Sequence, residues 1–150
     1  MNPNSLRREI ALQFLFHLEL PVNNEQREEL IVEAEKNFDR YWDEFKTGLA
    51  HTLDHENEQK LIVTLKSLLT KHNFLVDSIE KYSNNWKLER ISRVNFSILL
   101  SAIHELTYIP QTPYKVVINE AVELSKKYGD QDSKDFINGL LDKYYQEEIA

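Results

Sequence analysis

Apolar residues recur at helical spacing along almost the whole chain, most clearly between residues 113 and 144. After Pro113, two rows of apolar side chains repeat every three or four residues, which predicts a helix with one broad buried face. These rows contain Val117, Ala121, Leu124 and Tyr128, and beside them Ile118 and Val122. Thr112 is a suitable cap, Pro113 suits a first turn, and Gly129 is predicted to end the helix in the left-handed conformation that glycine accepts.

A second helix is predicted directly after this break. Asp132 is expected to cap it by accepting hydrogen bonds from the backbone amides of Lys134 or Asp135. Its apolar stripe contains Phe136, Ile137, Leu140, Leu141 and Tyr144. The two helices are therefore expected to pack against each other across a tight turn.

The same spacing predicts five further helices in the rest of the chain. They cover residues 5–20, with Ser5 or Asn4 as cap, 25–52, 56–71, 73–82 and 92–107. In the second of them one face carries Leu30, Ala34, Phe38, Tyr41, Phe45 and Leu49. The helix over 92–107 is apolar nearly all round and should be central, and Trp86 before it should be a packing anchor.

The expected fold is all-α. We predict a compact helical bundle of about seven helices, in which two small three-helix-type subdomains pack together. A chain of 150 residues is the size of one ordinary domain, so we expect residues 1–150 to form it, with helical halves of about 1–82 and 83–150.

The composition agrees with a helical protein of the cytoplasm. Three glycines and four prolines leave long uninterrupted segments, and the absence of cysteine excludes disulfides and thiolate metal sites. No apolar run approaches the roughly 20 residues that a membrane span needs. We therefore expect a cytoplasmic protein with no membrane contact.

The net charge of −7 argues at first against nucleic acid, because lysine and arginine drive phosphate binding. The acidic residues, however, are concentrated. Residues 19–58 hold 12 acidic and 4 basic residues, so the remainder is close to neutral at +1. A local basic patch elsewhere in the chain is compatible with this distribution. The acidic stretch itself is interpreted as a solvated helix face.

Four residues of the C-terminal helices are not explained by packing. Asn119 and Glu120 lie inside one predicted helix, and Asn138 and Gly139 interrupt the next, although asparagine and glycine are poor residues for a helix interior. A structural interpretation is a satisfied amide at Asn119 or Asn138 and a close helix crossing at Gly139.

These residues belong to a composite motif that resembles the C-terminal signature of the bacterial NusB family. The motif comprises PYKVVINEAVEL from Pro113, then Lys126 and Lys127, an Asp-Ser pair at Asp132, and FINGLLDK from Phe136. Near the N-terminus, Arg8, Ala11, Gln13, Leu15 and Phe16 also match the family pattern, which usually ends in tyrosine where this chain has Phe16. The resemblance implies a non-catalytic transcription antitermination factor, with no cofactor, that supports ribosomal RNA transcription.

The resemblance also implies partners: boxA RNA, the ribosomal protein NusE, and RNA polymerase with other Nus factors. It assigns to RNA binding the positions Arg7, Arg8, Lys115, Lys126, Lys127, Asp132, Lys134, Phe136 and Asn138. The cations would hold phosphates, Phe136 would offer a stacking face, and Asp132 or Asn138 would contact base edges. Asn4, Ser5 and Leu6 stand where relatives commonly carry more arginines.

The central helix departs from the family pattern. Asn95 and Phe96 replace an acid and a base that are common in relatives, and Leu100 replaces an arginine. Together with Phe16, these residues are candidate partner contacts, for NusE or for a second copy in a homodimer that associates through Phe96 and Leu100. The alternative is that Phe96 and Leu100 are absorbed into the core.

Catalytic and metal chemistry find little support. The chain has no GxSxG elbow, phosphate loop, dinucleotide fingerprint or HExxH motif, and His104 beside Glu105 has no identifiable nucleophile partner. His51 and His55 are four residues apart, but no third ligand completes a zinc site. The alternative to antitermination is therefore a dimeric interaction module of the same fold. The RNA-binding interpretation requires Arg8 at one chain end to lie close to Lys115 and Phe136 at the other.

Overall fold

The structure is a computed structural model that describes residues 2–84 and 87–150. Within them it contains eight α-helices, one short 3-10 helix and no strand, which confirms the all-α prediction. The chain forms two compact units, Met1–Lys71 and His72–Ala150. Trp86, the predicted packing anchor, lies outside the described residues. None of the described helices has the length and apolar character that a membrane crossing requires.

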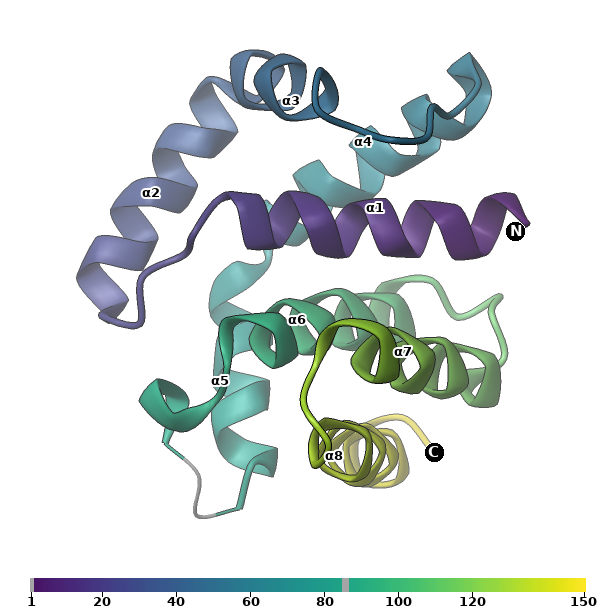
Figure 1. Ribbon diagram of the computed structural model, residues 1–150. Helices are drawn as coiled ribbons and strands as arrows, with labels where there is room; N and C mark the ends of the chain where they lie inside the picture. Colours follow the sequence, from purple (N-terminus) through teal and green to yellow (C-terminus); the bar gives the residue numbers. More distant parts are fainter. Residues whose placement is uncertain (1, 85–86) are drawn as a thin grey trace. The chain divides into compact units, whose positions relative to one another are not determined.

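The N-terminal unit contains α1 (Pro3–His17), α2 (Asn24–Lys36), α3 (Phe38–Lys46) and α4 (His55–Thr70) (Figure 1). Both α1 and α2 contact α3 and α4. The first helix begins earlier than predicted: the Asn2 side chain, rather than Asn4 or Ser5, is the cap and accepts a 2.8 Å hydrogen bond from the Ser5 amide. Pro3 occupies the first turn, where its missing amide donor is not needed.

The helix predicted over 25–52 is in fact two helices, α2 and α3, separated at Asn37. This residue leaves the helical conformation (φ −119°, ψ 35°), and its side-chain amide bonds back to the Glu33 carbonyl oxygen, as a C-terminal cap would. The break changes the direction of the chain. Trp42 is therefore buried where Tyr41 was predicted, because Tyr41 turns partly outward and donates its hydroxyl to Glu33.

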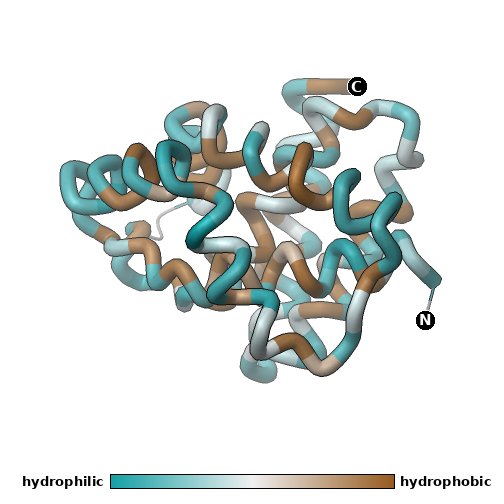
Figure 2. The backbone as a smooth tube through the Cα atoms, turned by 90° about the horizontal axis from the view of Figure 1, so that it is seen from above, coloured by the Kyte–Doolittle hydropathy of each residue, from teal (hydrophilic) through white to brown (hydrophobic). Residues whose placement is uncertain are grey.

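Aromatic side chains form the core of this unit. The Phe14 ring is fully buried, and its centroid lies 5.6 Å from Phe38, 5.8 Å from Trp42 and 5.3 Å from Phe45. The Trp42 indole N–H donates to Glu58 Oε1 at 3.2 Å, so the one polar atom of this ring is satisfied. The ring contacts hold α1 to α3, and the indole hydrogen bond ties α3 to α4. Figure 2 shows the alternation of hydrophobic and hydrophilic positions along the helices that produces such faces.

The C-terminal unit contains α5 (His72–Tyr82), the 3-10 helix η1 (Leu88–Arg90), α6 (Arg93–Tyr108), α7 (Tyr114–Tyr128) and α8 (Ser133–Glu148). α6 contacts the other three α-helices of the unit, as expected from its apolar surface. Tyr144 joins three of these helices, because its hydroxyl lies 2.8 Å from Thr107 Oγ1 on α6 and its ring meets Tyr82 of α5 edge-on at 5.6 Å.

The turn between α7 and α8 differs from the prediction. Gly129 ends α7 with an extended backbone (φ −93°, ψ −175°) and not in the left-handed region. Glycine is required at position 129 because no side chain fits there: a Cβ atom would lie 2.6 Å from Ser133 Oγ and 2.7 Å from the Ser125 carbonyl oxygen. The predicted cap is also wrong, because the Asp132 side chain makes no capping hydrogen bond.

Two further details correct the sequence analysis. Nothing lies within 4 Å of a Cβ built on Gly139, so no close helix crossing explains this glycine. Tyr128, predicted in the buried stripe of α7, is 36% exposed. The start of α7 also shifts by one residue, since Pro113 is the cap and Tyr114 the first helical residue.

Candidate nucleic-acid interface

The predicted RNA contacts of the C-terminal unit include four exposed polar side chains with no internal role. Within the described residues, the side chains of Lys115, Asp132, Lys134 and Asn138 make no hydrogen bond, ion pair or ring contact. Solvated lysines are ordinary. An asparagine within a helix, however, lowers helix stability, and here no side-chain contact of these kinds within the described residues compensates for that loss. These four groups are available to a ligand.

The other two predicted cations of this unit have intramolecular partners. Lys126 pairs with Glu123 at 3.1 Å, and both side chains are more than half exposed, so this ion pair is weak and exchangeable. The Lys127 ammonium lies 5.4 Å from the centre of the Tyr128 ring. Both lysines remain exposed and charged.

On α7, three polar residues form a row along one flank. At 100° per residue, Lys115, Asn119 and Lys126 lie within about 40° of one another, and the row is about 17 Å long. Asn119 is exposed and has no side-chain partner in the described part of the chain, so the satisfied amide considered from the sequence is not present. Asn119 was not among the predicted RNA contacts, although its spacing of four from Lys115 was a usable signal.

A matching row runs along α8. Lys134, Asn138 and Tyr145 fall within about 40° around this helix. The Tyr145 ring stacks on Tyr114 of α7, with centroids 3.9 Å apart and planes at 8°, so this edge of α8 adjoins α7. Phe136 lies about 160° away from Lys134 and Asn138, at the other edge of the exposed surface, and is half-buried. Lys134 and Phe136 therefore lie on different sides of α8.

Asp130, rather than Asp132, organises the turn before α8. Its Oδ1 accepts hydrogen bonds from the Asp132 amide (3.1 Å) and the Ser133 hydroxyl (2.9 Å), while the Asp130 amide donates to Ser133 Oγ (3.1 Å). Ser133 is almost fully buried. The result is a closed ring of hydrogen bonds that leaves the Asp132 carboxylate exposed at the surface.

In the N-terminal unit, the two predicted arginines are half-buried. The Arg7 guanidinium donates to the side-chain oxygens of Asn4 on α1 and Asn57 on α4. Both acceptors are neutral amides, so the positive charge persists while the side chain is held in one place. Asp54 lies close by: hydrogen bonds from the Asn57 amide and side chain lower the pKa of its carboxyl, and Arg7 contributes weakly. Arg8 also has interactions within the chain. Arg8 and Lys115 belong to different units, and their proximity stays a prediction.

The predicted partner contacts fall into two groups. Phe16 is 41% exposed, whereas Asn95 and Phe96 are each 8% exposed and Leu100 is 1% exposed. Burial within the chain favours the interpretation of Phe96 and Leu100 as core residues. Asn95 Oδ1 is buried and has no hydrogen-bond partner among the described residues.

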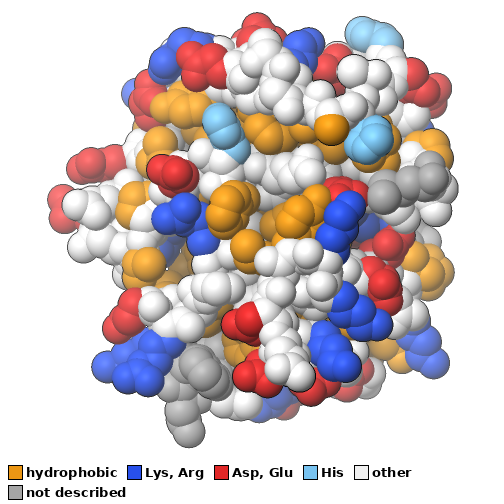
Figure 3. Space-filling model, in the orientation of Figure 1, with side chains coloured by type: hydrophobic (Ala, Val, Ile, Leu, Met, Phe, Trp, Pro, Cys, Tyr) orange, Lys and Arg blue, Asp and Glu red, His pale blue; other side chains and the backbone are white. Residues whose placement is uncertain are grey.

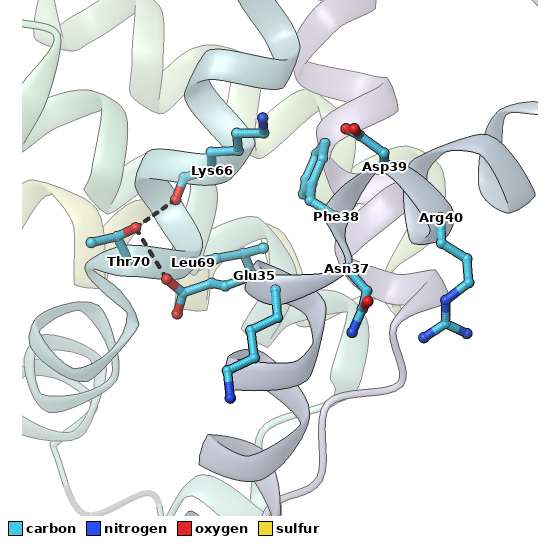
Figure 4. A pocket seen from close by; sticks show the side chains of 9 residues that line it. Glu35, Asn37, Phe38, Asp39, Arg40, Lys66, Leu69 and Thr70 are labelled. Carbon is cyan, nitrogen blue, oxygen red and sulfur yellow. Dashed lines mark hydrogen bonds between the residues drawn. The ribbon is translucent and has the colours of Figure 1, made fainter.

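In the N-terminal unit, a cavity of about 520 Å³ lies between α4 and the junction of α2 with α3 at Asn37 (Figure 4). Its lining carries side chains of both charges and consists of Glu35, Lys36, Asn37, Phe38, Asp39, Arg40, Lys66, Leu69 and Thr70. Glu35 accepts a 3.4 Å hydrogen bond from the Thr70 hydroxyl, and Lys66 covers the Phe38 ring at 5.3 Å. Mixed charge of this kind does not favour a polyanion.

The pair of histidines considered as metal ligands is split by the fold. His51 lies in the loop before α4, and His55 is the first residue of that helix, so they do not share a helical face. Across the described part of the chain no three His, Asp or Glu side chains gather around a common point. On the face seen in Figure 3, basic and acidic side chains are interspersed over α7 and α8. This face therefore carries no uniform positive field.

Comparisons with known proteins agree on one family. The family model of the NusB family matches residues 5–146. The transcription antitermination protein NusB of Acetivibrio thermocellus is 35% identical over 91% of this chain and 83% of its own length. That of Thermodesulfovibrio yellowstonii is 34% identical over 95% and 91%. The solved structure of T. maritima NusB superposes with a TM-score of 0.69 at 25% identity, covering 93% of this chain and 91% of that one.

Proposed function

The chain belongs to the NusB family of transcription antitermination proteins, and from this premise we propose that it binds boxA-type single-stranded RNA together with the ribosomal protein NusE. In this role it joins RNA polymerase and other Nus factors in the cytoplasm and promotes transcription through ribosomal RNA operons. It acts by binding and carries out no reaction.

The observation that carries this proposal is a set of exposed polar groups in the family motif that make no hydrogen bond, ion pair or ring contact with other described side chains. Lys115, Asp132, Lys134 and Asn138 are exposed, and none of them has a side-chain partner in the described residues. Asn119 joins them on α7. A helix that served only the fold would have better helix formers at 119 and 138. Their presence is explained if they donate to and accept from a ligand.

The proposed interface divides the work between charge and shape. Lys115 and Lys126 on α7, and Lys134 on α8, hold phosphates, since they lie at the ends of two rows about 17 Å long. Asn119 and Asn138 in the middle of these rows, with Asp132 in the turn, contact base edges. Single-stranded RNA suits this surface, because its unpaired bases are free to turn toward side chains.

The remaining predicted contacts have supporting roles in this proposal. The N-terminal cations Arg7 and Arg8, and Lys127, extend the phosphate contacts, and Phe136 receives a base at the outer edge of α8. NusE contacts the exposed Phe16 and adjoining surface. Homodimerisation through Phe96 and Leu100 is not favoured, because both side chains are already buried within the chain.

The test is fluorescence anisotropy with a labelled boxA-type RNA and a scrambled RNA of the same composition, with and without NusE. We expect preference for boxA, and a loss of affinity in Lys115→Ala and Lys134→Ala. Each variant should reduce the slope of log affinity against log salt by about 0.7, because each removes one phosphate contact to a single strand.

Lys36→Ala is the matched control for these variants. Lys36 is an exposed lysine on α2 with no partner in the described residues, and it lies outside the family motif. Its removal changes the net charge by the same amount but should leave the affinity and the slope almost unchanged. Equal binding of boxA and scrambled RNA in all conditions, NusE included, would reject the proposal.

A further inference from the structure

Tyr114 and Tyr145 form a close ring pair at the end of the α7–α8 hairpin. Their centroids are 3.9 Å apart and their planes differ by 8°, so the rings are stacked and nearly parallel. The rings around Phe14 in the other unit, by comparison, meet tilted or edge-on at 5.3–5.8 Å. Because the two tyrosine rings are nearly parallel, a third flat ring can add to the same stack.

The pair is at the surface and not in the core. Both tyrosines are half-buried, and neither has any other ring contact or side-chain hydrogen bond within the described residues. Tyr144, the neighbour of Tyr145, supplies the buried ring that packs against Tyr82 and bonds to Thr107. Packing of α8 therefore does not need a second large ring at 145. The stack presents aromatic surface and two hydroxyl groups to solvent.

The position of the pair relates it to the proposed RNA surface. Tyr114 precedes Lys115 directly, and Tyr145 continues the row of Lys134 and Asn138 along α8, about 17 Å from Lys134. The stack thus ends the polar row of α8, and on α7 it lies one residue before Lys115 and about 100° around the helix from it. A strand of RNA that follows the row of α8 arrives at an aromatic surface.

The local charge selects which part of a nucleotide binds there. Asp142, Glu147 and Glu148 lie close in sequence to Tyr145 and outnumber Lys143 there, so the α8 side of the stack does not attract phosphate, whereas Lys115 lies next to Tyr114 on α7. Glu148 is engaged with Lys81 and Tyr82 of α5. An aromatic ring attracts a base by stacking irrespective of this charge, and stacking tolerates any base because each has a π-face.

We infer that the Tyr114–Tyr145 stack is a subsite for one unpaired RNA base, which continues the stack as a third ring beside the phosphate contact of Lys115. The inference rests on the proposed RNA-binding function and extends it. The occupant is a nucleobase, and its bound phosphate is held by Lys115 and not by the tyrosines.

The test compares Tyr145→Leu with Tyr145→Phe in the boxA anisotropy assay. Leucine keeps apolar bulk and removes the ring, and we expect an affinity between about 5-fold and about 150-fold lower, the range for loss of one base stack. Phenylalanine keeps the ring and should stay within about 2-fold of the wild type. The salt slope should be unchanged in both, in contrast to Lys115→Ala, because no charge is removed.

A second measurement on the unaltered protein decides the matter if Tyr145→Leu fails to fold. RNA with 4-thiouridine at successive positions is irradiated in the complex, and the adducts are located by mass spectrometry. We expect one position to attach to a peptide that contains Tyr114 or Tyr145. Adducts confined to other peptides, or a folded Tyr145→Leu that binds like the wild type, would overturn the inference. The proposed function would stand in either case, provided that the wild-type protein still prefers boxA over scrambled RNA.

Discussion

Gly129 and Gly139 are predicted to respond in opposite directions to the same substitution. In Gly129→Ala, the new Cβ would lie 2.6 Å from Ser133 Oγ and 2.7 Å from the Ser125 carbonyl oxygen. Ser133 is 1% exposed and cannot rotate toward water, and rotation would break its two hydrogen bonds with Asp130. The clash therefore has to be relieved by movement of the turn between α7 and α8.

The magnitude follows from these contacts. Overpacking of a tight site costs about 1–3 kcal/mol, and each of the two hydrogen bonds contributes about 1 kcal/mol. The reduced entropy of the unfolded alanine chain returns about 0.5–1 kcal/mol. We therefore expect Gly129→Ala to lower the free energy of unfolding by about 2–4 kcal/mol.

Gly139→Ala is the matched control on the next helix. Nothing lies within 4 Å of the added Cβ, and the residue is exposed in the interior of α8. Alanine is the better helix former there, so the free energy of unfolding should rise by about 0.5–1 kcal/mol.

Urea denaturation followed by circular dichroism measures both effects. With an m-value of about 2 kcal/mol/M, the midpoint should fall by about 1–2 M for Gly129→Ala and rise by about 0.3–0.5 M for Gly139→Ala. A Gly129→Ala protein as stable as the wild type would show that the turn is not closed around the glycine. A destabilised Gly139→Ala would show a helix contact at a site that is open here.

Three further predictions concern other parts of the chain. Glu148→Gln replaces the carboxylate that accepts from Tyr82 and from Lys81 (3.0 Å) by a neutral amide, which accepts more weakly and cannot titrate; these hydrogen bonds lower the pKa of the Glu148 carboxyl below 4.5 in the folded protein. The stabilisation is present above pH 4.5 and is lost as the pH falls through the lowered pKa, so the Tm difference between wild type and variant should shrink only in acid; an undiminished difference at about pH 2 would contradict this. Leu100→Ala should lower the free energy of unfolding by about 2–5 kcal/mol, because the side chain is 1% exposed, without a change in the mass measured by light scattering; a change from dimer to monomer would restore the partner interpretation. Asn119→Ala should weaken boxA binding several-fold with an unchanged salt slope, since it removes a neutral hydrogen bond, and a changed slope would point to a shifted phosphate contact.

The helical fold was predictable because hydrophobic spacing is local and repeated. The apolar rows of α7 and α8 were placed correctly at Val117, Ala121, Ile137 and Leu141, all of which are buried. The break at Asn37 was not, because a single asparagine within an apolar period that continues on both sides carries little local signal. The backbone of Asn37 and the burial of Trp42 in the aromatic core show that the period is reset there.

Among the candidate site residues, the sequence identified the polar positions but not the hydrogen bonds and ring contacts that each side chain makes within the fold. Asp132 and Asp130 are both plausible caps by composition, since aspartate accepts amide hydrogen bonds in either place. The choice depends on Ser133, whose buried hydroxyl pairs with Asp130 in a way that a linear pattern does not specify. Likewise, two adjacent tyrosines at 144 and 145 are equivalent by type, and the packing of α8 assigns one to the core and one to the stack with Tyr114.

The assignment of Asp130 to the turn has a functional consequence for Asp132. A carboxylate that capped α8 would have its oxygens engaged by backbone amides, and a ligand would have to compete with the helix for them. Because Asp130 closes the turn, Asp132 contributes little to folding, and Asp132→Asn should leave the urea midpoint unchanged. The same substitution removes a negative charge beside the proposed phosphate contact of Lys134, so RNA binding should tighten if Asp132 only faces phosphates and weaken if it accepts from a base. Anisotropy with boxA and scrambled RNA separates these cases: tighter binding of both RNAs indicates relief of repulsion, and weaker binding of boxA alone indicates a base contact. A large fall in the midpoint would instead return Asp132 to the role of a cap.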